Sequence, residues 1–90
     1  MFWGIMKLTL IRQINSCCTL NFFYKTDAPI NLEVFARSFP LNEAYKSRGY
    51  AFVDNNEYMI YSVIGSNEIK IVAKNKSFDI SSIVSKIETI

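Results

Sequence analysis

Alternation of apolar and polar side chains predicts an extended strand early in the chain. From Ile14 to Phe23, even-numbered residues fall on one face and odd-numbered residues on the other, which is the two-residue period of a half-buried β-strand. Residues 8–11 either extend this strand or form a separate short one, and the periodicity does not distinguish the two. Within the strand the adjacent Cys17 and Cys18 would point to opposite faces, one into the core and one away from it.

A helical period replaces the alternation after Pro29. Apolar side chains recur at the i, i+3, i+4, i+7 spacing of an amphipathic helix, at Leu32, Phe35, Ala36 and Phe39. Asn31 is the expected N-cap. Pro40 ends the helix, because a residue that precedes proline is pushed out of the α region. The apolar stripe requires a sheet to cover it.

Three further extended runs are predicted at Gly49 to Asp54, Tyr58 to Ile64 and Glu68 to Lys74. Their connections are of hairpin length, so the strands should be antiparallel neighbours. The last run separates into a core side and a wetter side, with Ile69, Ile71 and Ala73 opposing Glu68, Lys70, Val72 and Lys74. In the middle run Met59, Tyr61 and Val63 oppose Tyr58, Ile60, Ser62 and Ile64, and both faces are fairly apolar.

A second amphipathic helix is predicted from Asp79 to Ile90. Its apolar stripe consists of Ile80, Ile83, Val84 and Ile87. Asp79 is the expected N-cap, and Phe78 is expected to pack on Ile83. The predicted order is therefore β-α-β-β-β-α, in one α+β domain over residues 1–90 with a flexible segment at residues 1–7. A curved antiparallel sheet with both helices on one face is the economical architecture.

Composition permits one folded domain and leaves the partner open. Of the 90 residues 50% are hydrophobic, and ten basic against eight acidic residues leave a net charge of +2. That charge neither demands nor excludes nucleic acid. Lys7 and Arg12 interrupt the apolar start, so we expect no signal peptide and no membrane anchor. Two adjacent cysteines suit free thiols in a reducing, intracellular compartment, without a choice between cytoplasm and nucleus.

Recognisable catalytic chemistry is missing from the sequence. There is no histidine, the commonest general base and metal ligand. The single Cys17–Cys18 pair does not have the spacing of a zinc site. Three glycines form no phosphate-binding loop, and the carboxylates are scattered singly. We therefore expect a protein that is not an enzyme and has no metal, cofactor or small-molecule substrate.

Three segments, 31–36 (NLEVFA), 39–45 (FPLNEAY) and 64–75 (IGSNEIKIVAKN), resemble parts of a single repeat of the TATA-box-binding protein fold. They are similar to the opening of its first helix, the run that closes that helix, and the Gly-Ser hairpin with the lead into its last helix. The resemblance covers roughly residues 14–88. It implies a DNA-binding sheet, with Asn15 where the family places an asparagine that contacts the minor groove.

The chain departs from this family at the positions that matter most for DNA. The family kinks DNA by wedging phenylalanines between base steps. The similar positions here fall near Ser47 and at Ile64; an isoleucine can wedge, and a serine cannot. The family also carries two repeats in one chain, so a single repeat would have to pair with a second copy. The resemblance thus implies a homodimer.

Two functions follow from these observations. The first is a non-catalytic binding or protein-interaction module that uses the helix-free face of the sheet and assembles as a homodimer. The alternative is a domain similar to the TATA-box-binding protein, related to transcription, that reads an A·T-rich minor groove. The candidate contacts on this face are Asn15, Thr19, Asn21, Tyr58, Ile60, Ser62, Ile64, Lys70, Val72 and Lys74. For the interaction module, the aromatic side chains of Tyr50, Phe52, Tyr58 and Tyr61 are candidate anchors.

Overall fold

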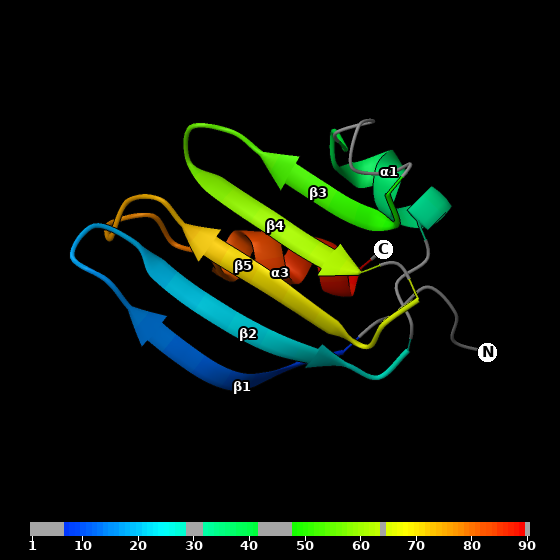
Figure 1. The fold of residues 1–90 in the computed structure, drawn as a ribbon, viewed down its shortest axis with the longest axis horizontal. Helices are drawn as coiled ribbons and strands as arrows, with labels where there is room; N and C mark the ends of the chain where they lie inside the picture. Colours follow the sequence, from blue (N-terminus) through cyan, green and yellow to red (C-terminus); the bar gives the residue numbers. More distant parts are fainter. Residues whose placement is uncertain (1–6, 29–31, 42–47, 64, 90) are drawn as a thin grey trace.

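The computed structural model describes residues 7–28, 32–41, 48–63 and 65–89, and within them the chain forms a five-stranded antiparallel sheet and two helices (Figure 1). The elements are β1 (Leu8–Asn15), β2 (Leu20–Thr26), α1 (Leu32–Ser38), β3 (Tyr50–Asp54), β4 (Tyr58–Val63), β5 (Glu68–Ala73) and α3 (Ser81–Glu88). The strands lie in the order β1-β2-β5-β4-β3. The expected α+β class is confirmed. The predictions for residues 1–6, Asn31, residues 42–47 with Ser47, and Ile64 lie outside the described residues.

The single strand predicted from Ile14 to Phe23 is wrong, because a hairpin turn divides it into β1 and β2. In the turn the Ser16 N–H donates to the Thr19 carbonyl at 2.9 Å. Cys17 and Cys18 therefore sit at the hairpin tip as exposed free thiols, with their Sγ atoms 3.1 Å apart. The expectation that one thiol enters the core is wrong as well. The observed order is β-β-α-β-β-β-α.

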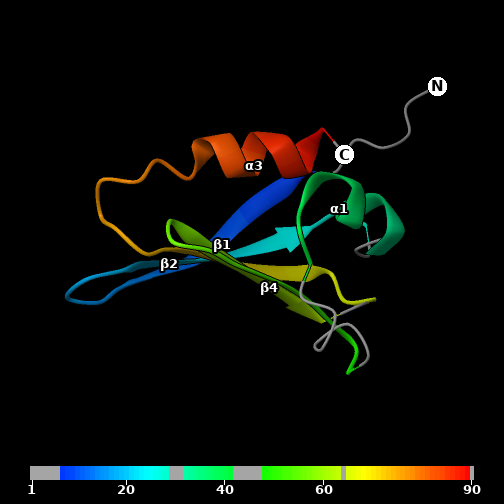
Figure 2. The same cartoon turned by 90° about the horizontal axis from the view of Figure 1, so that it is seen from above.

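Both helices lie on the same face of the sheet (Figure 2). Phe35 and Phe39 of α1 and Ile83 and Ile87 of α3 belong to one buried cluster with the strand residues Leu8, Tyr24, Val53, Ile60, Ile69 and Ile71. The rings of Phe35 and Phe39 stack at 4.8 Å. Ala36, predicted to share this stripe, is exposed, so the buried stripe of α1 is narrower than its sequence pattern suggests.

The N-cap of α3 is Ile80, one residue after the predicted cap Asp79. The helix begins at Ser81, and the residue before it, Ile80, already has φ −76° and ψ −7°. A carboxylate oxygen of Asp79 accepts a hydrogen bond from the Ser81 N–H at 2.9 Å, so Asp79 still satisfies a donor of the first turn. Phe78, predicted to pack on Ile83, stacks on the ring of Tyr58 at 5.7 Å.

The last turn of α3 is attached to the beginning of the sheet. The Leu8 N–H at the start of β1 donates to the Glu88 carboxylate at 3.0 Å, and the side chain of Leu8 is buried. The helix thereby covers the strands from one side and leaves the other side uncovered. Neither of the described helices has the length and apolarity that crossing a membrane requires.

Candidate functional site

The register of β4 decides which side chains reach the uncovered side of the sheet, which we call the helix-free face. Ile60 pairs with Ile71 and with Val53, and all three belong to the core beneath the helices. Ile60 is 0% exposed and Ser62 only 2%, while Tyr58 packs against the same core. The prediction that Tyr58, Ile60 and Ser62 lie on the helix-free face is therefore wrong.

The other candidates fall into two groups. Asn21, Lys70 and Val72 lie on the helix-free face, although Val72 is only 7% exposed, and Lys74 there forms an ion pair with Asp54. Asn15 is paired with Leu20, a residue of the opposite face, so its predicted placement is wrong. Thr19 is half-buried in the β1–β2 turn, where its hydroxyl lies 2.6 Å from that of Ser16.

The helix-free face carries one row of residues that crosses all five strands. Arg12 is paired with Phe23, Phe23 with Lys70, Lys70 with Tyr61, and Tyr61 with Phe52. We call these five residues the cation–aromatic row. Its members come from β1, β2, β5, β4 and β3 in turn, so the antiparallel register alone brings them together.

Contacts within the row hold its rings in place. The Arg12 guanidinium carbon lies 4.7 Å and the Lys70 ammonium 5.4 Å from the centroid of the Phe23 ring, both within the range of a cation–π contact. The Tyr61 ring lies 6.4 Å from Phe52 in an edge-to-face arrangement and 5.2 Å from Tyr50. The row is a prearranged set of cations and aromatic surfaces.

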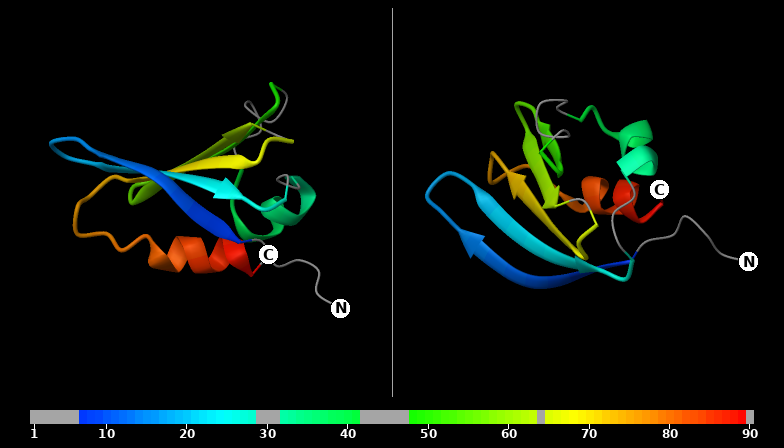
Figure 3. Two further views of the ribbon diagram at one scale, coloured as in Figure 1. Left: turned by 90° about the horizontal axis from the view of Figure 1, so that it is seen from below. Right: turned by 45° about the vertical axis from the view of Figure 1, so that its right-hand side comes forward.

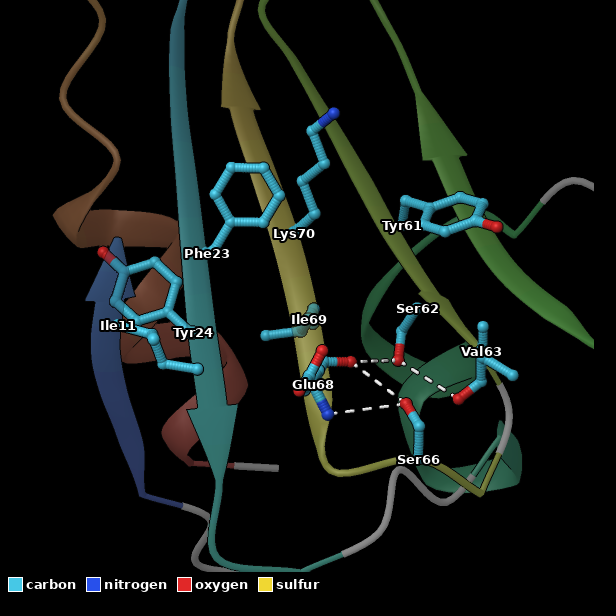
Figure 4. A pocket seen from close by; sticks show the side chains of 10 residues that line it. All are labelled: Ile11, Phe23, Tyr24, Tyr61, Ser62, Val63, Ser66, Glu68, Ile69 and Lys70. Carbon is cyan, nitrogen blue, oxygen red and sulfur yellow. Dashed lines mark hydrogen bonds between the residues drawn. The ribbon is translucent and has the colours of Figure 1, made fainter. Parts of the chain in front are cut away.

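A hollow opens on this face where β4 and β5 separate. Their pairing ends at Tyr61 and Lys70, and beyond this point the Ser62 hydroxyl donates to the Glu68 carbonyl at 2.8 Å. The resulting space is about 250 Å³. Figure 4 shows Phe23 and Tyr61 on the two sides of Lys70 above it. The lining consists of Ile11, Phe23, Tyr24, Tyr61, Ser62, Val63, Ser66, Glu68, Ile69 and Lys70.

Electrostatics make the row cationic and its phenol neutral. Arg12 and Lys70 form no ion pair with a carboxylate among the described residues, whereas Lys74 is neutralised by Asp54. A tyrosine hydroxyl is protonated at neutral pH, and desolvation, helped by a hydrogen bond with Tyr50, raises the pKa of Tyr61 further above its ordinary value. The site can therefore stack, attract anions and form hydrogen bonds.

The row was missed by sequence reasoning for an identifiable reason. Of its five members, Lys70 was among the predicted contacts of the helix-free face, while Phe52 and Tyr61 were predicted only as aromatic anchors. Counting from the Gly65–Asn67 connection between the predicted strands places Ser62 opposite Lys70, whereas the structure pairs Tyr61 with Lys70. This shift of one residue moves every side chain of β4 to the other face of the sheet. For Arg12 and Phe23 the sequence lacked a turn signal that would separate β1 from β2.

Neither a metal site among the described residues nor a related protein indicates a function. Among the residues that the structure describes, no three His, Cys, Asp or Glu side chains are grouped as metal ligands. A comparison of the chain with protein-family models, with curated proteins and with solved structures finds no match. The functional argument therefore rests on the geometry of the helix-free face.

Proposed function

We propose that this chain is a non-catalytic binding module that binds nucleic acid with its helix-free face. The observation that carries the proposal is the cation–aromatic row, in which Arg12, Phe23, Lys70, Tyr61 and Phe52 succeed one another across the sheet. Cations attract phosphates, and aromatic rings stack on bases. A surface that combines cations and rings in one row suits a partner that alternates phosphates and bases.

Self-association through the row itself is disfavoured by its charge pattern. In a symmetric dimer the same patch faces itself, and a twofold axis at the centre of the row would set Lys70 against Lys70. Two like charges directly opposed in a desolvated interface are destabilising. We therefore assign the expected homodimer to the outer edge of β1, where Leu10 is 49% and Ile11 55% exposed.

Few side chains on this face favour an A·T-rich duplex in particular, whereas the whole row favours nucleic acid in general. The Asn21 amide nitrogen already donates to the Ile14 carbonyl at 3.1 Å and to the Thr19 hydroxyl at 3.4 Å, which leaves its oxygen as an acceptor. The minor-groove edges of A·T pairs present only acceptors, so they require donors from the protein. Lys70 supplies such a donor on this face, and Asn15 does not. A fold like a repeat of the TATA-box-binding protein stays an inference from the motifs.

We also infer that the protein works in a reducing compartment. Cys17 and Cys18 are exposed free thiols at the tip of the β1–β2 hairpin, and exposed thiols persist where the surroundings keep them reduced.

The proposal is tested by fluorescence anisotropy with a labelled A·T-rich duplex and with one of its single strands, at about 50 and about 200 mM salt. We expect binding at the lower salt. The double variant Arg12→Gln, Lys70→Gln should weaken it. The slope of log K against log salt should also become shallower by about one for each phosphate that the variant no longer neutralises.

The matched control is Lys76→Gln, Lys86→Gln, which removes the same charge from exposed positions outside the row. It should retain most of the affinity. Binding to neither nucleic acid at low salt would overturn the proposal. An equal loss of affinity in both double variants would show that nucleic acid is attracted only by the net charge of the protein and not by the row.

A further inference from the structure

We infer that the nucleic acid bound by this face is single-stranded, and that one unpaired base enters the hollow between β4 and β5 and stacks on Phe23 or Tyr61. The inference rests on the proposed function and specifies its partner. It starts from the shape of the site. An aromatic ring can stack on a base only where the base presents its flat face, and bases inside a duplex are covered by their neighbours.

The position of the two rings favours an unpaired base. Phe23 and Tyr61 belong to strands that flank β5, and both line the hollow. Its volume of about 250 Å³ lies slightly below the range of roughly 300–1,000 Å³ usual for drug-sized ligands. It therefore suits one flat ring system better than a larger molecule. In Figure 4 both helices lie behind the sheet, on the side away from the viewer.

The charges around the hollow orient the strand. Arg12 and Lys70 contact the Phe23 ring at one end, whereas Glu68 lines the other. Phosphates are attracted to the first end and repelled by the second. The backbone should therefore follow the row, with the base turned towards Glu68 and Ser66. A carboxylate accepts hydrogen bonds from the exocyclic amino group of cytosine, so the hollow should prefer cytosine to thymine.

Flat surfaces lined by cations also occur in protein–protein interfaces. The spacing of charges and rings in the row nevertheless fits a nucleic-acid strand better than a protein. A protein partner would need carboxylates spaced to match Arg12 and Lys70 and flat groups to cover the rings between them. A single nucleic-acid strand provides both with every nucleotide. Charge complementarity along the row thus selects the strand as the occupant.

The inference is tested with the full chain and a labelled single strand of about 12 nucleotides without self-complementarity, compared with its duplex. We expect the single strand to bind at least about fivefold more tightly, since each stacked base contributes about that factor or more. The separate variants Phe23→Leu and Tyr61→Leu keep an apolar side chain without the aromatic face. Each should lose about fivefold or more in affinity for the single strand and little for the duplex.

Two controls make the same chemical change on the other face of the same strands. Phe22 and Tyr58 pack against the core beneath the helices, so Phe22→Leu and Tyr58→Leu should leave affinity unchanged while they lower stability. Circular dichroism checks that every variant is folded. Should the row variants unfold, ultraviolet cross-linking of the wild-type protein to a strand that carries 5-bromocytosine keeps the test open. The cross-linked peptide should contain Phe23 or Tyr61.

The outcomes separate the two proposals. Equal binding of strand and duplex, with wild-type affinity in Phe23→Leu and Tyr61→Leu, would overturn the stacking inference and leave nucleic-acid binding intact. Binding to neither would overturn both. A mass that doubles with concentration and returns to that of a monomer in Phe23→Leu would assign the face to a second copy of the chain.

Discussion

Single side chains at the boundaries of elements determine where those elements start. Asp79 accepts a hydrogen bond from the Ser81 N–H, and this bond is the main cause that lowers the pKa of its carboxyl below the ordinary value. A second contribution comes from the Ser81 side chain. The ionised carboxylate also lies at the positive end of the α3 helix dipole. The first turn of α3 is thus stabilised by one charged acceptor.

We expect Asp79→Ala to lower the melting temperature at pH 7. Because the pKa in the folded state is lowered, the ionised carboxylate stabilises the fold above the unfolded pKa of about 3.9. That contribution disappears as the pH falls through the folded value. The difference between variant and wild type, followed by circular dichroism, should therefore shrink below about pH 4. Asp79→Asn retains an acceptor and should lower the melting temperature less than Asp79→Ala does. A difference that stays constant down to pH 2 would contradict the mechanism.

At the scale of elements, β1 is one of the two edge strands of the sheet, and β3 is the other. β1 pairs only with β2 in the described sheet and lies at one margin of it (Figure 3). A register shift between Leu10 and Arg12 interrupts the regular ladder, as bulges at sheet edges commonly do. Leu10, Ile11 and Ile14 nevertheless leave about half of their surface uncovered, with exposed fractions of 49%, 55% and 46%. An edge of this kind favours pairing with the same edge of a second copy.

Leu10→Lys should weaken that dimer at least about tenfold, because a charged side chain replaces an apolar one that the partner would cover. Light scattering after size-exclusion chromatography, over a series of concentrations, measures the effect. Val63→Lys is the matched control, since Val63 is 46% exposed on β4, away from the edge. A wild-type protein that stays monomeric at every concentration would remove the homodimer. Leu10 lies on the helix side of β1, so nucleic-acid binding should persist in its variant.

At the scale of the molecule, the sheet and both helices share one core within the part of the chain that the structure describes. Ile87 of α3, Ile71 of β5 and Ile60 of β4 are all 0% exposed and belong to the same cluster as Phe35 of α1. A domain of this size is stable by only about 5–15 kcal/mol. Loss of one buried side chain should consequently weaken every element together.

We expect Ile87→Ala to destabilise the protein by about 2–5 kcal/mol, because apolar burial is reduced and a cavity is left behind. Urea denaturation should show a single transition, with the same midpoint whether it is followed by far-ultraviolet circular dichroism or by aromatic fluorescence. Ile14→Ala makes the same change at a side chain that is 46% exposed and should cost less than about 0.5 kcal/mol. Separate transitions of helix and sheet would contradict a shared core.

The elements with strong periodic patterns could be predicted, and those with ambiguous patterns could not. In β5 the alternation of Ile69, Lys70 and Ile71 identified the buried face correctly, because polar and apolar positions differ clearly. In β4 both Ile60 and Tyr61 are apolar enough for either face. Three of the predicted contact residues were therefore assigned to the wrong side of the sheet.

The sequence by itself determined the class of the fold, the three-strand meander after α1, and the two amphipathic helices, since these follow from local periodicity and short connections. Only the tertiary structure decided that Cys17 and Cys18 occupy a turn and that Arg12, Phe23, Lys70, Tyr61 and Phe52 form one row. The physical reason is that the row depends on the register between five strands. That register is set by the packing of one face against the helices, and no single segment contains this information.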